Sequence, residues 1–284
     1  MSYILSFKRK GTITPEHPIT PSESDLVALG ILPKQISEFT NTDIGKVEIS
    51  IPYIDAGGVI SGPIVFELVG VNHHTNSEHQ QTITLMTKNI IRNAAFDAKE
   101  SGNPDSNRAE YGNNHWKCSN IRQWLNSSEA AGSWFIEKYE NNEYDASPTA
   151  DRVYNADGAY ADEPGFLAGF SADVLQHFTD ITNTTAVPTA DGGGSETTVD
   201  KVFLPSLTEL GYGNNNGITE GTPLSLRYSD PDSKIKSGAN GSYWMRSPLT
   251  DTSNLGNIIN YDGLIRNPPV YRGDSGIAPT IVLH

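Results

Sequence analysis

The sequence predicts an α+β fold built from short strands, a few short helices and long ordered loops. Apolar and polar residues alternate over short stretches at several places, as they do in half-buried strands. Helical spacing of apolar residues is confined to a few short segments. The chain also holds 26 glycines and 17 prolines among 284 residues, which favours turns and excludes a bundle of long helices.

The first 60 residues differ from the remainder and are interpreted as an N-terminal arm or small attachment subdomain. Prolines interrupt a polar stretch over residues 15–21. A short helix is expected to begin at Ser22, with Asp25 completing an approximate capping box, and to end at Gly30. One larger domain is then expected over residues 61–284.

Three strands are predicted around the start of that domain. Residues 46–54 alternate between apolar and polar side chains, which indicates a half-buried strand. Residues 64–71 are apolar nearly throughout, and residues 82–87 alternate apolar residues with threonines. The last two stretches are expected to be neighbours joined by a polar hairpin loop over residues 72–81.

The clearest helix signal follows Ser119, which is a typical N-cap residue. Apolar residues then recur at helical spacing, and the predicted buried face carries Ile121, Trp124 and Leu125. Arg122 and Gln123 are expected to face solvent. A short core helix is therefore predicted here.

The second half of the chain offers weaker signals. Ser171 is expected to cap another short helix, and Ser206 with Glu209 forms a capping box after the apolar stretch 202–204. Residues 182–198, rich in threonine and glycine, are interpreted as a loop. Beyond residue 210 only short strands are expected, at residues 243–245, 257–261 and 277–283.

Composition excludes several classes of protein. The formal net charge of −14 opposes binding to nucleic acid, whose phosphates must be neutralised by Lys and Arg. No run approaches the ~20 apolar residues of a membrane span, and the first ten residues do not have the pattern of a signal peptide. Neither nucleic acid nor a membrane is expected as a partner. Cys118 is the single cysteine, so an internal disulfide is impossible.

No motif in the sequence predicts a catalytic residue, a cofactor or a metal ion. The G-x-S-x-G elbow and the H-E-x-x-H pattern are both missing. Carboxylates gather between Asp145 and Glu163, where two readings stay open: a bound calcium ion, or an acidic loop exposed to solvent. Their spacing does not match an EF-hand.

The remaining signal is a C-terminal set of aromatic and planar polar residues. Tyr, Trp and Arg give a large contact area with little loss of rotamer freedom, and Asn adapts its donors and acceptors, so these residues favour recognition over chemistry. Burial in a strand is the competing interpretation for Trp244. The candidate ligand-binding residues are Trp244, Arg246, Asn254, Asn257, Asn260, Tyr261, Arg266, Tyr271 and Arg272.

Six ordered motifs carry a resemblance to a known family. They lie at residues 106–116, 119–127, 165–171, 200–206, 243–248 and 276–279. The sequence resembles an uncharacterised domain family of Gram-positive gut bacteria, their prophages and their phages, which is similar to the C-type-lectin-like fold of formylglycine-generating enzymes. The resemblance covers roughly residues 60–284.

The resemblance implies a C-type-lectin-like domain that displays its ligand contacts between residues 249 and 275. It does not extend to formylglycine chemistry, which uses a cysteine pair where this chain has Cys118 alone. The Trp-Asn-Asp motif of calcium-dependent sugar lectins is also missing, and the sequence at 163–165 matches their Glu-Pro-Asn only in part.

The expected function is that of a non-enzymatic structural protein of a phage or prophage virion, assembled in the host cytoplasm. Residues 1–60 are expected to attach to other capsid or tail proteins, while the lectin-like domain decorates the exterior and contacts a host-surface glycan or protein. A homo-oligomer stays open. The alternative is a cell-envelope enzyme acting on glycans, or a secreted sugar-binding protein.

Overall fold

The computed structural model describes residues 24–284 apart from residues 56, 61, 225–230 and 239. Within these residues two five-stranded sheets and a hairpin are combined with a few short helices, so the fold is α+β, as the sequence predicted. The α-helices are α1 Ser24–Ala28, α2 Ser106–Tyr111, α3 Asn120–Leu125 and α4 Ala172–Leu175. The 3-10 helices are η1 Ile36–Glu38, η2 Asn41–Asp43, η3 Trp116–Cys118, η4 Tyr139–Asn141, η5 Ala156–Gly158, η6 Phe166–Gly169, η7 Thr189–Asp191 and η9 Asp232–Lys234.

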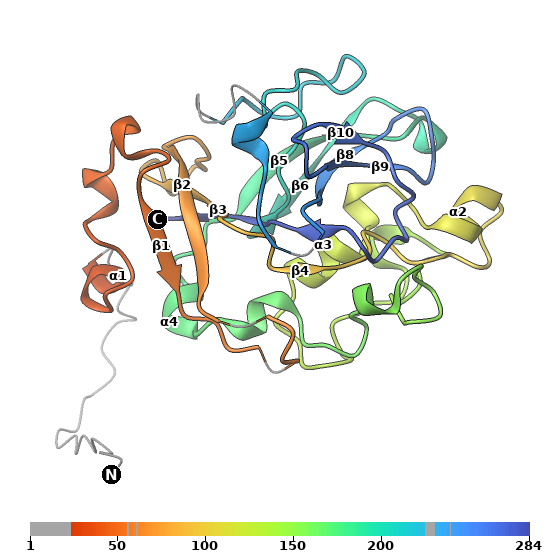
Figure 1. Ribbon diagram of the computed structural model, residues 1–284, viewed down its shortest axis with the longest axis horizontal. Coiled ribbons are helices and arrows are strands. Elements are labelled where there is room, and N and C mark those ends of the chain that lie inside the picture. Colours follow the sequence, from red (N-terminus) through yellow and green to blue (C-terminus); the bar gives the residue numbers. More distant parts are fainter. Residues whose placement is uncertain (1–23, 56, 61, 225–230, 239) are drawn as a thin grey trace, which may run out of the picture.

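The first sheet is antiparallel throughout and follows the order β1-β2-β3-β12-β7. Its strands are β1 Glu48–Ile51, β2 Ile64–Val71, β3 Ile83–Thr87, β12 Thr280–Leu283 and β7 Val202–Phe203. The C-terminal strand β12 therefore lies inside this sheet, between β3 and β7 (Figure 1). The strand pair predicted at 64–71 and 82–87 is confirmed, with the loop between them in the expected place.

The second sheet is mixed and follows the order β10-β9-β8-β11-β4. Its strands are β10 Ile265–Arg266, β9 Gly256–Ile259, β8 Tyr243–Pro248, β11 Gly276–Ile277 and β4 Arg92–Asn93. The three C-terminal strand predictions are confirmed within a few residues, with the last one divided between β11 and β12.

The described residues between 24 and 60 pack against the larger domain. Figure 1 shows α1 and β1 beside β2 along one side of the molecule. β1 pairs with β2 from Glu48 opposite Glu67 to Ile51 opposite Ile64. Leu26 and Ile51 are fully buried in the same hydrophobic core as Trp124. The burial of this segment stabilises the sheet edge, and the expected helix start at Ser22 lies outside the described residues.

Residues 182–198 form a hairpin where a loop was expected. β5 Ile181–Ala186 and β6 Ser195–Asp200 pair in register from Ile181 opposite Asp200 to Ala186 opposite Ser195. The prediction was wrong because the inward-facing side chains of this hairpin are polar: Asn183, Thr185, Thr198 and Asp200 are all buried.

The expectation that Arg122 and Gln123 face solvent is also wrong. Helix α3 begins after Ser119, whose hydroxyl accepts the Arg122 amide, and every residue in it is buried. Arg122 Nε donates to Asp200 of the hairpin at 2.7 Å, and Trp116 Nε1 donates to the same carboxylate at 3.4 Å. The hairpin thus covers the polar side of α3 and neutralises its arginine.

Candidate functional site

Four of the predicted ligand-binding residues lie inside the protein, which corrects their assignment. Trp244 and Arg246 on β8 are fully buried, and Asn254 and Asn257 are nearly so. The Trp244 indole donates to the Ala94 carbonyl at 2.8 Å. The Asn257 amide donates to the carbonyls of Ser247 and Pro248, each at 3.0 Å. These side chains hold β8 and its neighbours together and offer no surface to a ligand.

Arg246 is the cation of a buried charge network. Its guanidinium forms two hydrogen bonds to Glu209, at 2.6 and 2.8 Å, and His74 Nε2 lies 3.1 Å from the same carboxylate. The predicted capping box is present, because the Ser206 amide donates to Glu209 and the Glu209 amide donates to the Ser206 hydroxyl. Although burial disfavours the carboxylate, Arg246 and His74 hold the pKa of Glu209 well below its usual range.

Four other predicted residues line one open cleft of about 460 Å³, here called the C-terminal cleft. These are Asn260, Tyr261, Arg266 and Arg272. The tight turn from β9 to β10 carries Tyr261 and leaves it 68% exposed. In that turn the Asn260 amide donates to the Leu264 carbonyl at 2.9 Å, so the side chains rest on an ordered backbone.

Tyr271, the ninth candidate, belongs to a cluster of tyrosines beside this cleft. Its ring centroid lies 5.5 Å from that of Tyr111 and 5.8 Å from that of Tyr154. The Arg272 guanidinium, which lines the cleft, lies 5.1 Å from the Tyr154 ring centroid, and Lys99 Nζ lies 5.2 Å from that of Tyr271. The cleft and the tyrosine cluster therefore form one surface.

The charged side chains of this surface form ion pairs with their neighbours. Arg272 donates through Nε to Asp274 at 2.9 Å, and Arg266 donates to Asp262 at 2.8 Å. The hydrogen bond from Arg272 lowers the pKa of Asp274, so this carboxylate is ionised at neutral pH. Each of the two guanidiniums is therefore positioned by a carboxylate close to it in sequence. Sequence reasoning missed Tyr111, Tyr154 and Lys99, because chain separation hides their contact with Tyr271.

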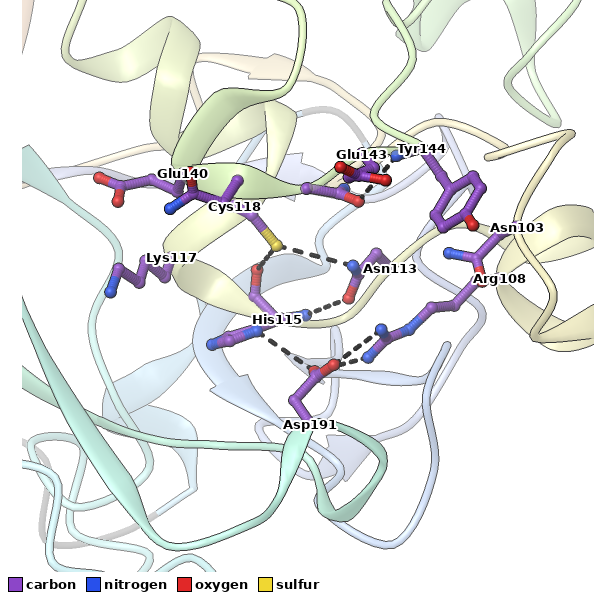
Figure 2. Close-up of a pocket in the computed structure, with 12 residues that line it drawn as sticks. Asn103, Arg108, Asn113, His115, Lys117, Cys118, Glu140, Glu143, Tyr144 and Asp191 are labelled. Carbon is purple, nitrogen blue, oxygen red and sulfur yellow. Dashed lines mark hydrogen bonds and ion pairs between the residues drawn. The ribbon is translucent and has the colours of Figure 1, made fainter.

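A second cleft holds the single cysteine beside a histidine and a carboxylate (Figure 2). His115 Nδ1 lies 3.2 Å from Asp191, and His115 Nε2 contacts Glu196. Asp191 also takes two hydrogen bonds from Arg108, at 2.8 and 2.6 Å. The Cys118 thiol donates to the His115 carbonyl at 3.7 Å and accepts from the Asn113 amide at 3.6 Å.

These residues do not form an activated nucleophile. Burial opposes a charged imidazole, but the hydrogen bonds that Asp191 and Glu196 accept outweigh it and raise the pKa of His115 to about 11. A ring that is already protonated cannot accept the thiol proton. Burial likewise raises the pKa of Cys118 to about 11, so the sulfur stays a thiol at neutral pH. The geometry suits a structural ion network.

The carboxylates between Asp145 and Glu163 are spread over different partners. Asp145 accepts the Asn120 amide at 2.9 Å, Asp151 accepts the Thr149 hydroxyl at 2.6 Å, and Glu163 pairs with Arg92. Within the described residues no group of three or more His, Cys, Asp and Glu side chains is placed to hold a metal ion. No helix of that part of the chain is both long and apolar enough to cross a bilayer.

Asp145 makes stability depend on pH. Burial and the nearby charge of Glu100 raise its pKa to about 7, whereas an unfolded Asp titrates near ~4. Between these two pKa values the folded state holds one more proton than the unfolded state. The stability that the protonated Asp145 contributes is therefore complete below pH ~4 and is lost as the pH rises to about 7. We expect the free energy of unfolding of Asp145→Asn to rise by about 2 kcal/mol relative to that of the wild type as the pH goes from 5 to 8.

Urea unfolding at several pH values measures this difference. Asp157→Asn is the matched control, since Asp157 is exposed. The difference in free energy of unfolding between this variant and the wild type should stay the same over this pH range. A pH-independent difference for Asp145→Asn would show that this carboxyl titrates normally.

The fold and its clefts define an α+β domain that presents polar and aromatic side chains to solvent. A family model described as a domain of unknown function (DUF6273) matches residues 80–284, and the chain belongs to this family. Comparison with curated proteins gave no match, and comparison with solved structures gave none. The relation to the C-type-lectin-like fold stays a prediction.

Proposed function

We propose that the protein is a non-enzymatic structural protein of a phage or prophage virion, whose domain decorates the capsid or tail and binds a ligand on the host surface. One observation carries the binding half of this proposal. Five of the predicted recognition residues lie on the continuous surface of the C-terminal cleft and the tyrosine cluster. They are Asn260, Tyr261, Arg266, Tyr271 and Arg272. The virion half rests on the resemblance of the six motifs to a family found in phages.

The chemistry of the surface supports binding. Tyrosine and arginine are among the residue types enriched in binding hot spots. Here the Arg272 guanidinium lies over the Tyr154 ring and the Lys99 ammonium over the Tyr271 ring before any ligand arrives. Such preorganisation lowers the entropy lost on binding. The protonated His115 and the buried Cys118 thiol favour this reading over an enzyme.

Attachment to other virion proteins is proposed for residues 1–60. In the described part of this segment, apolar side chains pack into the core of the domain, while Leu29, Ile54 and Val59 are at least half exposed. Exposed apolar side chains of this size fit a contact with another protein. The proposed attachment surface therefore includes these three side chains, near the edge of the sheet that β1 forms.

A triple substitution tests the ligand surface. We expect Tyr261→Ala, Arg266→Ala and Tyr271→Ala together to abolish adsorption to host cells, because a single hot-spot residue contributes about 2 kcal/mol, or roughly 30-fold in affinity. Incorporation into particles should be retained, and the melting temperature should stay within a few degrees, since none of the three is fully buried.

Val199→Ala with Ile136→Ala is the matched control, because both side chains are exposed and neither lines this cleft. Adsorption of the control should equal that of the wild type. If the triple variant adsorbs normally while assembly fails, the surface serves the particle and not the host contact.

A further inference from the structure

The second cleft has the features of a binding site that is separate from the C-terminal cleft. It encloses about 290 Å³ between α2, η3, η4 and the turn that joins β5 to β6. This volume matches the lower end of ligand pockets, about 300 Å³. Figure 2 shows the Arg108 guanidinium and the His115 ring converging on Asp191 at the wall of the cleft.

Three asparagines of this cleft are oriented by one buried carboxylate. Glu100 is fully buried beneath the cleft and accepts the side-chain amides of Asn103 at 2.5 Å, Asn113 at 3.4 Å and Asn142. The three asparagines come from separate segments and all line the cavity. Their amides are therefore fixed before a ligand binds, which is the arrangement expected of a preorganised polar site.

The ionic side chains of the cleft balance one another. Arg108, Lys117 and protonated His115 stand against Asp191, Glu140 and Glu143. Each of the cations faces a carboxylate: Arg108 and His115 face Asp191, and Lys117 Nζ lies 3.5 Å from Glu196. A charged ligand would meet no excess of opposite charge, whereas a neutral ligand with many hydroxyl groups suits amides that donate and accept.

One wall combines an aromatic ring with an unusual backbone. Tyr144 lines the cleft and is 41% exposed, which leaves a ring face for the C–H face of a sugar. Just before it, Lys138, Glu140 and Asn141 have φ values of 59°, 50° and 66°, in the left-handed region that non-glycine residues seldom adopt. Glu140 and Asn141 both line the cavity, and the Glu140 carboxylate also accepts Arg122 Nη1 at 3.2 Å.

We propose that this cleft binds a neutral saccharide, with Tyr144 stacking on a sugar ring, the asparagine amides contacting its hydroxyl or acetamido groups, and Glu100 acting as a positioning residue. The site is distinct from the C-terminal cleft, with which it shares no lining residue. Binding here therefore does not depend on the function proposed above.

Calorimetric titration of the full chain tests the proposal with three tetrasaccharides of similar size. Chitotetraose is neutral, its fully deacetylated form is cationic, and tetragalacturonate is anionic. We expect the neutral sugar to bind at least five-fold more tightly than either charged one. Asn141→Gly should weaken its binding several-fold while retaining the fold, because glycine adopts the left-handed conformation without strain and loses only the amide.

Tyr144→Ala should weaken binding ten-fold or more, and Glu100→Gln should weaken it while leaving Tyr144 in place, with circular dichroism confirming that each variant is folded. Tyr261→Ala, in the C-terminal cleft, is the matched control and should bind like the wild type. The proposal is overturned if chitotetraose does not bind, if a charged sugar binds best, or if folded Asn141→Gly and Tyr144→Ala bind as the wild type does. Loss of binding in Tyr261→Ala alone would place the sugar in the C-terminal cleft.

Discussion

Replacing Arg246 with methionine is expected to lower the free energy of unfolding by about 3–5 kcal/mol, because it leaves Glu209 as an uncompensated charge in the interior. Both side chains are essentially inaccessible to solvent, and Arg246 supplies two of the hydrogen bonds to that carboxylate. His74 Nε2 lies 3.1 Å from the same carboxylate. Chemical denaturation monitored by tryptophan fluorescence measures the loss.

A second substitution separates charge from packing. Adding Glu209→Gln to Arg246→Met removes the buried charge while keeping a side chain that can accept the Ser206 amide. The double variant should recover part of the lost stability, since removing both charges of a buried pair costs less than removing one. If Arg246→Met proved as stable as the wild type, the guanidinium would face solvent, as its assignment to a ligand surface required.

Trp124→Ala is expected to cost a similar amount, about 3–5 kcal/mol, as deletions of large buried aromatic side chains do. The indole ring lies 5.6 Å from the ring of Tyr160 and 5.3 Å from that of Phe166, and its Nε1 donates to the Pro164 carbonyl at 2.8 Å. Alanine would leave a cavity in the main core and an unpaired carbonyl. Thermal or denaturant unfolding reports the loss directly.

Two further variants serve as controls for Trp124→Ala. Trp124→Phe keeps most of the ring volume and loses only the indole hydrogen bond, so its cost should be smaller. Tyr261→Ala removes an aromatic side chain that is 68% exposed and should change stability by less than about 0.5 kcal/mol. Equal stability of Trp124→Ala and Tyr261→Ala would contradict the burial of helix α3.

Local patterns were sufficient for most of the secondary structure. The strands at 64–71 and 82–87 were predicted because apolar and β-branched residues fill them, and the helix after Ser119 because its cap and its apolar spacing agree. The hairpin of β5 and β6 was missed for the opposite reason. Its inward side chains are polar, and their burial depends on Arg122 and Trp116, which lie far away in sequence.

The candidate site residues were likewise predicted only in part from local patterns. Residue type alone singled out Tyr261, Arg266, Tyr271 and Arg272 as suited to recognition, and these do lie on the surface. The same criterion selected Trp244 and Arg246, which are buried. Nothing local separates an arginine that faces solvent from one that neutralises Glu209, because the distinction lies in a partner that is distant along the chain.

The sequence by itself determined the α+β class, the positions of most strands and helices, and the residue types available for recognition, because these follow from the spacing of apolar side chains and from turn chemistry among near neighbours. Only the tertiary structure decided that β1 pairs with β2 at the edge of the sheet and that Tyr111 and Tyr154 contact Tyr271. The same holds for Glu100, which accepts the amides of asparagines that line a cleft. The physical reason is that strand pairing, burial of polar groups and charge neutralisation depend on contacts between segments far apart in the chain, which no local pattern of residues encodes.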